Sequence, residues 1–135
     1  MRLAITLFLL LWGSLALGQT CVNQGGGTAT LSWTPPTTNE DGTVLDNLAG
    51  YKIYMGCTQS GVYEDMLTLN NPGLSSFVVE FLKYDVVVYF TVTAFNTDGN
   101  ESVMSNEASK LMPPAPPPPP PPPKVPNPPT NLTVE

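Results

Sequence analysis

The sequence predicts an antiparallel all-β sandwich that follows an export signal and continues into an extended arm. Between residues 28 and 111, apolar residues alternate with polar ones, as they do along strands that bury a single face. Turn residues interrupt this alternation about every ten positions, a spacing typical of short sandwich strands. Helical periodicity is confined to the first eighteen residues, so an all-β fold is expected for the rest.

The first eighteen residues have the layout of a secretory signal peptide. They begin with Arg2, continue through an apolar run and end in small residues, so cleavage before Gln19 is expected. The run is shorter than the roughly 18 to 20 residues that a membrane-spanning helix needs. We therefore expect a secreted protein, extracellular or periplasmic. It would contact a membrane only if this segment stayed uncleaved as an anchor.

Size and charge narrow the classes of function. The chain has 135 residues, enough for one domain of ordinary size with its appendages. Of its five basic residues Arg2 belongs to the signal, which leaves four lysines against eleven carboxylates and no histidine. An acidic surface of this kind is poorly suited to phosphate backbones, so nucleic acid is excluded as a partner.

The two cysteines, Cys21 and Cys57, are expected to form a disulfide. An oxidising compartment favours the bridge, and two thiols without histidine make a poor zinc site. Closing a loop of about 36 residues is worth on the order of 3 to 4 kcal/mol in the chain-entropy model. The disulfide would therefore supply a large share of the stability of a small sandwich.

Six segments are predicted to be strands. The first ends at a double proline, which cannot donate to a sheet ladder, and the third has the weakest alternation. The fourth follows the turn signal "NNPG", and the fifth is the longest and ends at "TDGN", where glycine can take a positive φ. The segments are residues 28–33, 50–56, 63–69, 75–82, 86–96 and 102–111.

Alternation within these segments selects the predicted core. In the fourth strand it also points Phe81 inward, in step with the apolar residues before it. The side chains predicted to form the core are Leu31, Trp33, Tyr51, Ile53, Phe77, Val79, Leu82, Phe90, Val92 and Ala94.

The composition changes abruptly at the end of the last strand. Residues 112–129 are mostly proline and are expected to form a polyproline II linker of about 3.1 Å per residue, a semi-rigid spacer of roughly 50 Å. The alternative is a docking site for a proline-binding module. Residues 130–135 read again as a short strand.

Three phrases occur in an order that resembles a known family. They are "ATLSWTPP", "LAGYKIYMG" and "YFTVTAFNTDGNESVMSNEASK". Together they resemble the fibronectin type III domain from about residue 28 to residue 110, in particular the versions found in exported bacterial and phage-associated proteins. The resemblance implies an immunoglobulin-like sandwich over residues 19–111.

The resemblance also leads to specific expectations for a corner tyrosine, for the glycines at 25–27 and for the end of the chain. The tyrosine that the family uses to tie down a corner is replaced here by Val88, with Tyr89 one residue later, so that hydrogen bond is expected to be missing. The glycines at 25–27 would form the turn after a short first strand, which the disulfide would pin to the opposite sheet. Residues 130–135 resemble the start of a second such domain, either a truncated remnant or a strand available to another molecule.

No catalytic constellation is present in the sequence. Without histidine there is no ordinary Ser-His or Cys-His pair, and no carboxylates are placed for joint acid and base work. Calcium at Glu40, Asp41 and Asp46 is conceivable, although their spacing matches no known loop and a solvated acidic turn is the simpler interpretation. We expect neither an enzyme nor a bound cofactor.

Three aromatic side chains form the candidate binding surface. Tyr54, Tyr89 and Phe95 point outward by alternation from strands that the family places side by side. They could form a stacking platform for a sugar or a protein, or could simply be good strand formers.

The expected function is that of a secreted, non-catalytic module acting as a spacer, adhesion or protein-interaction domain. One alternative is a carbohydrate-binding accessory domain that uses the aromatic surface. The other is an assembly subunit that self-associates by strand exchange through residues 130–135. The sequence does not specify the partner, which could be a protein or a carbohydrate.

Overall fold

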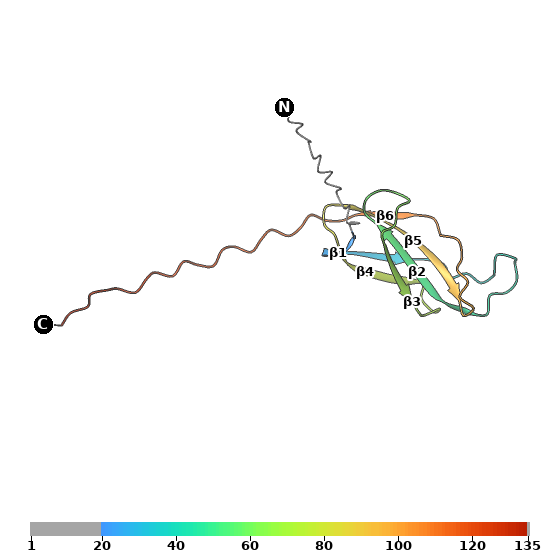
Figure 1. Ribbon diagram of the computed structural model, residues 1–135, viewed down its shortest axis with the longest axis horizontal. Coiled ribbons are helices and arrows are strands. Elements are labelled where there is room, and N and C mark those ends of the chain that lie inside the picture. The colour runs from blue at the N-terminus through green and yellow to red at the C-terminus, as the bar shows by residue number, and fades with distance from the viewer. Residues whose placement is uncertain (1–19, 135) are drawn as a thin grey trace, which may run out of the picture.

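The computed structural model describes residues 20–134, and the predicted signal peptide lies outside this range. Two antiparallel sheets face each other across a core, and an extended arm leaves the domain (Figure 1). One sheet has the order β1-β4 and the other β3-β2-β5-β6, which confirms the predicted all-β sandwich. Within the described residues no helix is long and apolar enough to cross a membrane. The strands are β1 (Val22–Ser32), β2 (Leu48–Gly56), β3 (Asp65–Leu69), β4 (Ser76–Leu82), β5 (Val87–Asn96) and β6 (Ala108–Leu111).

The core lies between the two sheets and draws on both. Of the side chains predicted to form it, Tyr51, Ile53, Val79, Leu82 and Phe90 are buried. Leu31, Trp33, Phe77 and Val92 are half-buried and pack against these, and Ala94 is also half-buried. Met112 is only 2% exposed and donates its N–H to Val86 O at 2.8 Å. Met112 is therefore the last buried residue of the domain, and the arm begins at Pro113, where Asp85 still binds Pro113 O (3.2 Å) and Ala115 N–H (3.4 Å).

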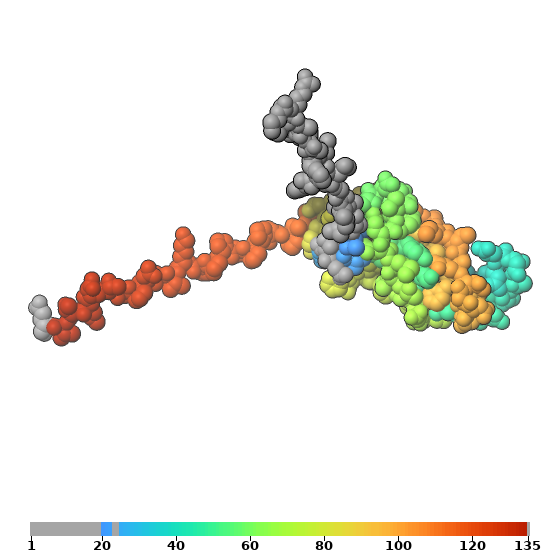
Figure 2. Space-filling model, in the orientation of Figure 1, coloured from blue at the N-terminus to red at the C-terminus, as the bar shows by residue number. Residues whose placement is uncertain are grey.

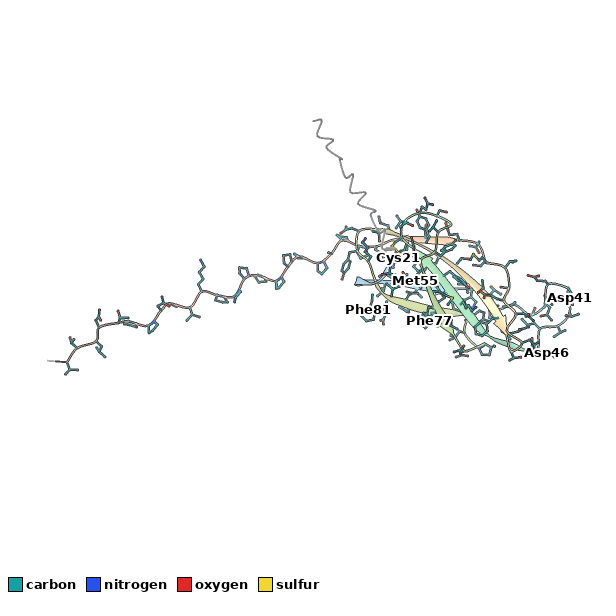
Figure 3. All side chains as sticks on the ribbon, viewed as in Figure 1. Cys21, Asp41, Asp46, Met55, Phe77 and Phe81 are labelled. Carbon is teal, nitrogen blue, oxygen red and sulfur yellow. A yellow bond between two sulfur atoms is a disulfide. The ribbon has the colours of Figure 1, made fainter. Side chains whose placement is uncertain are left out.

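The prediction that Phe81 points inward is wrong, because β4 contains a bulge. Phe81, labelled in Figure 3, has a φ of 59° and is 59% exposed, whereas Leu82 is completely buried. The β1-β4 register shifts between the pair Ala29 and Val79 and the pair Gly27 and Leu82. One extra residue reverses the alternation of side chains after it, so Leu82 takes the inward place.

The expected glycine turn at residues 25–27 is not present. β1 runs through the glycines as one irregular strand and pairs with β4 alone. The glycines instead allow close packing, since a Cβ on Gly25 would lie 2.6 Å from Leu82 O and 2.9 Å from the Tyr84 ring. No separate first strand forms in the described residues, and the second edge of β1 stays open.

The last predicted strand is shorter than expected. Only Ala108–Leu111 forms a ladder with β5, whereas residues 102–107 bond to β5 only at Ser102 and Ser105, whose N–H groups donate to Ala94 O and Val92 O, each at 2.9 Å. The hydroxyl oxygens of Ser102 and Ser105 accept hydrogen bonds from the N–H groups of Ala94 and Val92, each at 3.0 Å. Because serine oxygens take the place of ladder carbonyls, the alternation in this segment does not correspond to regular strand pairing.

The disulfide joins the two sheets. Cys21, just before β1, is bonded to Cys57, just after β2, with 5.7 Å between their Cα atoms. Carboxylates reinforce the junction: Asp65 accepts from the N–H groups of Cys21 (2.5 Å) and Val22 (3.3 Å). Cys57 N–H in turn donates to Glu64 at 3.2 Å. The first residues of β1 are therefore fastened to the larger sheet, as the resemblance implied.

Candidate functional site

The surface best placed to meet a partner is the end of the domain away from the arm. We call it the loop pole, formed by residues 33–47 between β1 and β2 and residues 96–101 after β5. Figure 1 shows the long first loop projecting at this end while the arm leaves from the other. Asp41 and Asp46 mark the loop pole in Figure 3, and Cys21 and Phe81 lie toward the arm.

The long loop folds as a small hairpin of its own. Asn39 N–H donates to Thr43 O at 2.8 Å, and Gly42, with a φ of 84°, makes the turn between them. Asp41 accepts from both the N–H (3.0 Å) and the hydroxyl (2.6 Å) of Thr43. The Thr43 hydroxyl, followed by its N–H, lowers the pKa of Asp41. This part of the surface is therefore held in shape by its own hydrogen bonds.

The calcium alternative gains no support from this geometry. Asp41 already uses its carboxylate on Thr43. In residues 20–134, Glu40, Asp41 and Asp46 do not bring three ligand atoms together at ligand distance. The group that does gather contains Cys21 and Cys57, whose sulfurs are joined in the disulfide, beside Glu64.

The second segment of the loop pole is equally well held. The Asn96 side-chain oxygen accepts from Asp98 N–H (3.1 Å) and Asn100 N–H (2.9 Å) across the turn. Asn47 Nδ2 donates to Asp98 at 2.8 Å, and Thr97 N–H donates to Asn47 O at 2.9 Å. These two bonds tie the turn to the long loop, so the two segments form one surface.

A hollow of about 250 Å³ lies between the two segments. The loop supplies Pro36, Asn39 and Glu40 on one side, and Phe95, Asn100 and Glu101 line the other. The lining mixes amides and carboxylates with the Phe95 ring and with the aliphatic residues Leu45, Leu48 and Ala94. Such a mixed hollow suits a peptide segment of a partner, which offers both backbone polar groups and apolar side chains.

Glu101 fastens the turn to the outer face of the larger sheet. Its carboxylate accepts from Lys52 Nζ (2.5 Å), Tyr54 Oη (2.6 Å) and Thr93 Oγ1 (2.7 Å). Led by the Lys52 contact, these bonds lower the pKa of Glu101 to about 2. The same contacts raise the pKa of Lys52 and of Tyr54.

The three predicted aromatic residues lie on this outer face but do not form one flat platform. All are half-buried, and Phe95 and Tyr89 lie near opposite ends of the β2-β5 ladder, opposite Gly50 and Gly56. The Tyr54 hydroxyl is bound to Glu101. Lys52 Nζ lies 5.9 Å from the centroid of the Phe95 ring. Two of the three aromatic side chains thus belong to the Glu101 cluster.

Lys52 and Glu101 were not singled out by the sequence analysis. Alternation places Lys52 beside Tyr54 on the outer face of β2, and this signal could have drawn attention to the lysine. Glu101 gives no such signal, because its position depends on the register of β2 against β5 and on the turn between them.

A second carboxylate stabilises the opposite end of the larger sheet. Glu107 accepts from Ser60 Oγ (2.6 Å), Gly61 N–H (2.8 Å) and Tyr63 Oη (2.6 Å). Led by the Ser60 bond, these contacts lower the pKa of Glu107, and the same carboxylate raises the pKa of Tyr63 to about 12. Both glutamates therefore hold turns in place. The Glu101 turn belongs to the loop pole, which thus offers a partner a surface of fixed shape.

The structural comparisons identify the fold as fibronectin type III. The solution structure of the third fibronectin III domain of the human KIAA0343 protein matches 72% of this chain and 79% of its own, with 20% identity and a TM-score of 0.54. The crystal structure of chicken CNTN1 FN1-FN3 domains matches 70% of this chain at 16% identity and a TM-score of 0.51. This chain covers 30% of that multidomain structure. No family model and no curated protein matches the sequence.

Proposed function

We propose that this protein is a secreted, non-catalytic fibronectin type III module that presents its loop pole to another protein while its arm acts as a spacer. The observation that carries the proposal is the placement of the two features at opposite ends of the domain (Figure 1). A surface on the far side from its tether stays accessible when the tether is attached to something else.

The arm supports the spacer role. Residues 113–134 are exposed and have no regular secondary structure, and beyond Ala115 they extend from the domain as a narrow arm (Figure 2). A polyproline II stretch from 113 to 129 would span roughly 50 Å at about 3.1 Å per residue. Such a stretch resists folding back, so it sets a distance as well as a connection.

The loop pole supports a protein partner. Its backbone is already ordered by hydrogen bonds, which reduces the conformational entropy lost on binding. Glu40, Asp41, Asp46 and Asp98 are exposed there, so a partner with basic or amide donor groups would be complementary. Export is supported by the disulfide and by the layout of residues 1–18.

A photo-cross-linking residue at position 40 tests this proposal. The mature chain carrying it would be added to the intact cells and secretions of the source organism, beside a matched chain with the same residue at Glu80 on β4. We expect specific protein cross-links from position 40, weakened by salt, and none from position 80. Equal labelling at both positions would show that the loop pole is not the binding surface.

The carbohydrate-binding alternative rests on Tyr54, Tyr89 and Phe95 sharing one face of the larger sheet. Their half-burial and the Tyr54 bond to Glu101 leave little flat ring surface for a sugar. Affinity electrophoresis on soluble polysaccharides separates the two functions. We expect no retardation of the wild-type chain, whereas retardation that Tyr89→Ala abolishes would favour carbohydrate binding.

A further inference from the structure

The smaller sheet has one unpaired edge. Trp33 N–H donates to Ser75 O at 2.9 Å, so the backbone groups of every second residue before Trp33 also point toward β4. By that alternation the backbone groups of Thr28, Thr30 and Ser32 point away from β4. Lys110 Nζ donates a hydrogen bond to Thr28 O at 2.7 Å. In residues 20–134 no strand pairs with the rest of this edge, which we call the open edge.

A groove runs beside the open edge between the two sheets. Its larger part, about 540 Å³, has a mixed lining: the apolar residues Leu31, Trp33, Phe90, Val92 and Ala108, and the polar residues Thr30, Ser32, Thr34, Thr91, Ser105 and Asn106. A second part of about 320 Å³ shares Trp33, Val92 and Ser105 with the first and reaches Pro36 and Glu40 of the loop pole. Trp33 Nε1 is buried here and has no hydrogen-bond partner. We call the two parts together the lateral groove.

An open edge next to a groove with apolar side chains on its walls has the two features that an added strand requires. The N–H and C=O groups of Thr30 and Ser32 can pair with its backbone, and every second side chain of the strand can enter the groove. The occupant must therefore be a short extended segment with alternating apolar residues and no proline at the paired positions.

Residues 130–134 of this chain have those properties. Leu132 and Val134 are 95% and 94% exposed and alternate with the polar residues Asn131 and Thr133. The segment has no proline and is as long as the edge from residue 28 to residue 32. In an antiparallel arrangement Thr133 would lie opposite Thr30, which places Leu132 beside Leu31 and Val134 beside Ala29. Asn131, with a φ of 61°, would become extended on pairing.

The arm prevents the segment from reaching its own domain. It starts at Pro113, next to the buried Met112, whose sulfur lies near Gly27 of β1. A polyproline II stretch of roughly 50 Å then separates residue 130 from that point. Pairing with β1 of the same chain would require the stretch to reverse direction. A second copy imposes no such reversal.

We infer that residues 130–134 of one copy add as a strand to the open edge of β1 in a second copy, with Leu132 in the lateral groove beside Leu31 and Val134 beside Ala29. In this register the added strand lies along residues 28–32 of β1, outside residues 33–47 and 96–101 of the loop pole. It would therefore join copies head to tail without blocking the proposed interaction surface, and either proposal can fail without the other.

Sedimentation of the mature full-length chain between ~10 and ~500 µM, together with amide exchange, tests this contact. We expect dimers or longer assemblies that dissociate on dilution, with the Thr30 and Ser32 amides protected only at high concentration. The double variant Leu132→Asp, Val134→Asp should weaken association about tenfold or more, because two charges would replace the apolar side chains placed beside Leu31 and Ala29. Val125→Asp, a change at an equally exposed position of the arm, should leave association unchanged.

A mixing experiment identifies the two halves of the contact. Thr30→Pro removes an N–H that faces the open edge and keeps the β4 ladder, so this chain can donate a strand but not accept one. Mixed with the double-aspartate chain, which can accept but not donate, it should form complexes that neither forms alone. If Thr30→Pro does not fold, amide exchange still tests the contact, because the double-aspartate chain alone should leave its Thr30 and Ser32 amides unprotected.

Three results would overturn the inference. The first is a wild-type chain that stays monomeric at the highest concentration with exchanging Thr30 and Ser32 amides. The second is association that survives the double-aspartate change, which would place the contact elsewhere. The third is protection of these amides at all concentrations, which would mean that the segment folds onto its own domain.

Discussion

The two sheets of this sandwich are stabilised in different ways. The four-stranded sheet has long regular ladders, and Glu101 and Glu107 add side-chain clamps at its two ends. The two-stranded sheet has a bulge at Phe81, a crowded glycine segment and an open edge. A two-stranded ribbon is marginal in water by itself. The comparison teaches that β1 and β4 depend on the core and on the disulfide for their order.

The largest effect on stability is expected for Cys57→Ser, which removes the disulfide. Releasing the 36-residue loop should lower the free energy of unfolding by about 3 to 4 kcal/mol, since the denatured chain regains entropy. The loss should appear first in the exchange of β1 amides. Thermal melting of wild type and variant, without reductant, measures the effect. An unchanged melting temperature would contradict the dependence of β1 on the bridge.

Gly25→Ala tests the close packing of the glycine segment. The added Cβ would approach the Leu82 carbonyl oxygen at 2.6 Å, and backbone atoms cannot move aside as a flexible side chain can. We expect a loss of about 1 to 3 kcal/mol in chemical denaturation. Gly73→Ala is the control, because its Cβ would meet only the Asn71 side chain, at 3.3 Å. Equal effects at both positions would refute the packing role.

Glu101→Gln tests the clamp on the larger sheet, and its effect should depend on pH. The pKa of Glu101 is about 2 in the folded protein and near 4.5 in the unfolded chain, so its carboxylate stabilises the fold above about pH 4.5. That contribution is lost as the pH falls from about 4.5 toward 2. Because the cluster is near the surface, we expect about 1 kcal/mol at neutral pH.

The pH dependence separates the clamp from a general loss of charge. Denaturation curves at pH 7 and pH 3 should show the difference between wild type and Glu101→Gln shrinking at the lower pH. Glu80→Gln, at an exposed position of β4, is the matched control and should have a smaller effect. A Glu101→Gln difference that is the same at both pH values would mean that the carboxylate charge does not stabilise the turn.

Phe81→Asn should produce the smallest change, and in the stabilising direction. Phe81 has a φ of 59°, which costs a non-glycine residue about 1 to 2 kcal/mol and which asparagine tolerates better. The lost contacts of this largely exposed ring offset part of the gain, so we expect an increase of up to about 1 kcal/mol. Val78→Asn, at an exposed neighbour without a positive φ, should give no increase. A clear loss at Phe81 would show that the ring is packed.

The sequence could predict the strands because burial of one face imposes a period of two residues. It could not predict where the period breaks. The bulge before Leu82 depends on the pairing of β4 with β1, and no residue type in the segment announces it. Three glycines resemble a turn, but here they allow Leu82 and Tyr84 to approach the backbone of β1.

The candidate site was less accessible to sequence reasoning than the fold. Outward alternation placed Tyr54, Tyr89 and Phe95 on one face, but whether they form a platform depends on what covers them. Glu101 comes from a turn, and it meets Lys52 and Tyr54 only because β2 and β5 pair in a particular register. The loop pole likewise depends on contacts such as that between Asn47 and Asp98, 51 residues apart.

Residue-resolved hydrogen exchange of the oxidised mature chain at low concentration tests most directly whether the two-stranded sheet depends on the core and on the disulfide for its order. The amides of Ala29 and Leu31, which face β4, should open with a lower free energy than those of Ile53 and Val92 in the larger sheet. Reduction of the disulfide should widen the difference. Equal protection of the two sheets, before and after reduction, would contradict the account.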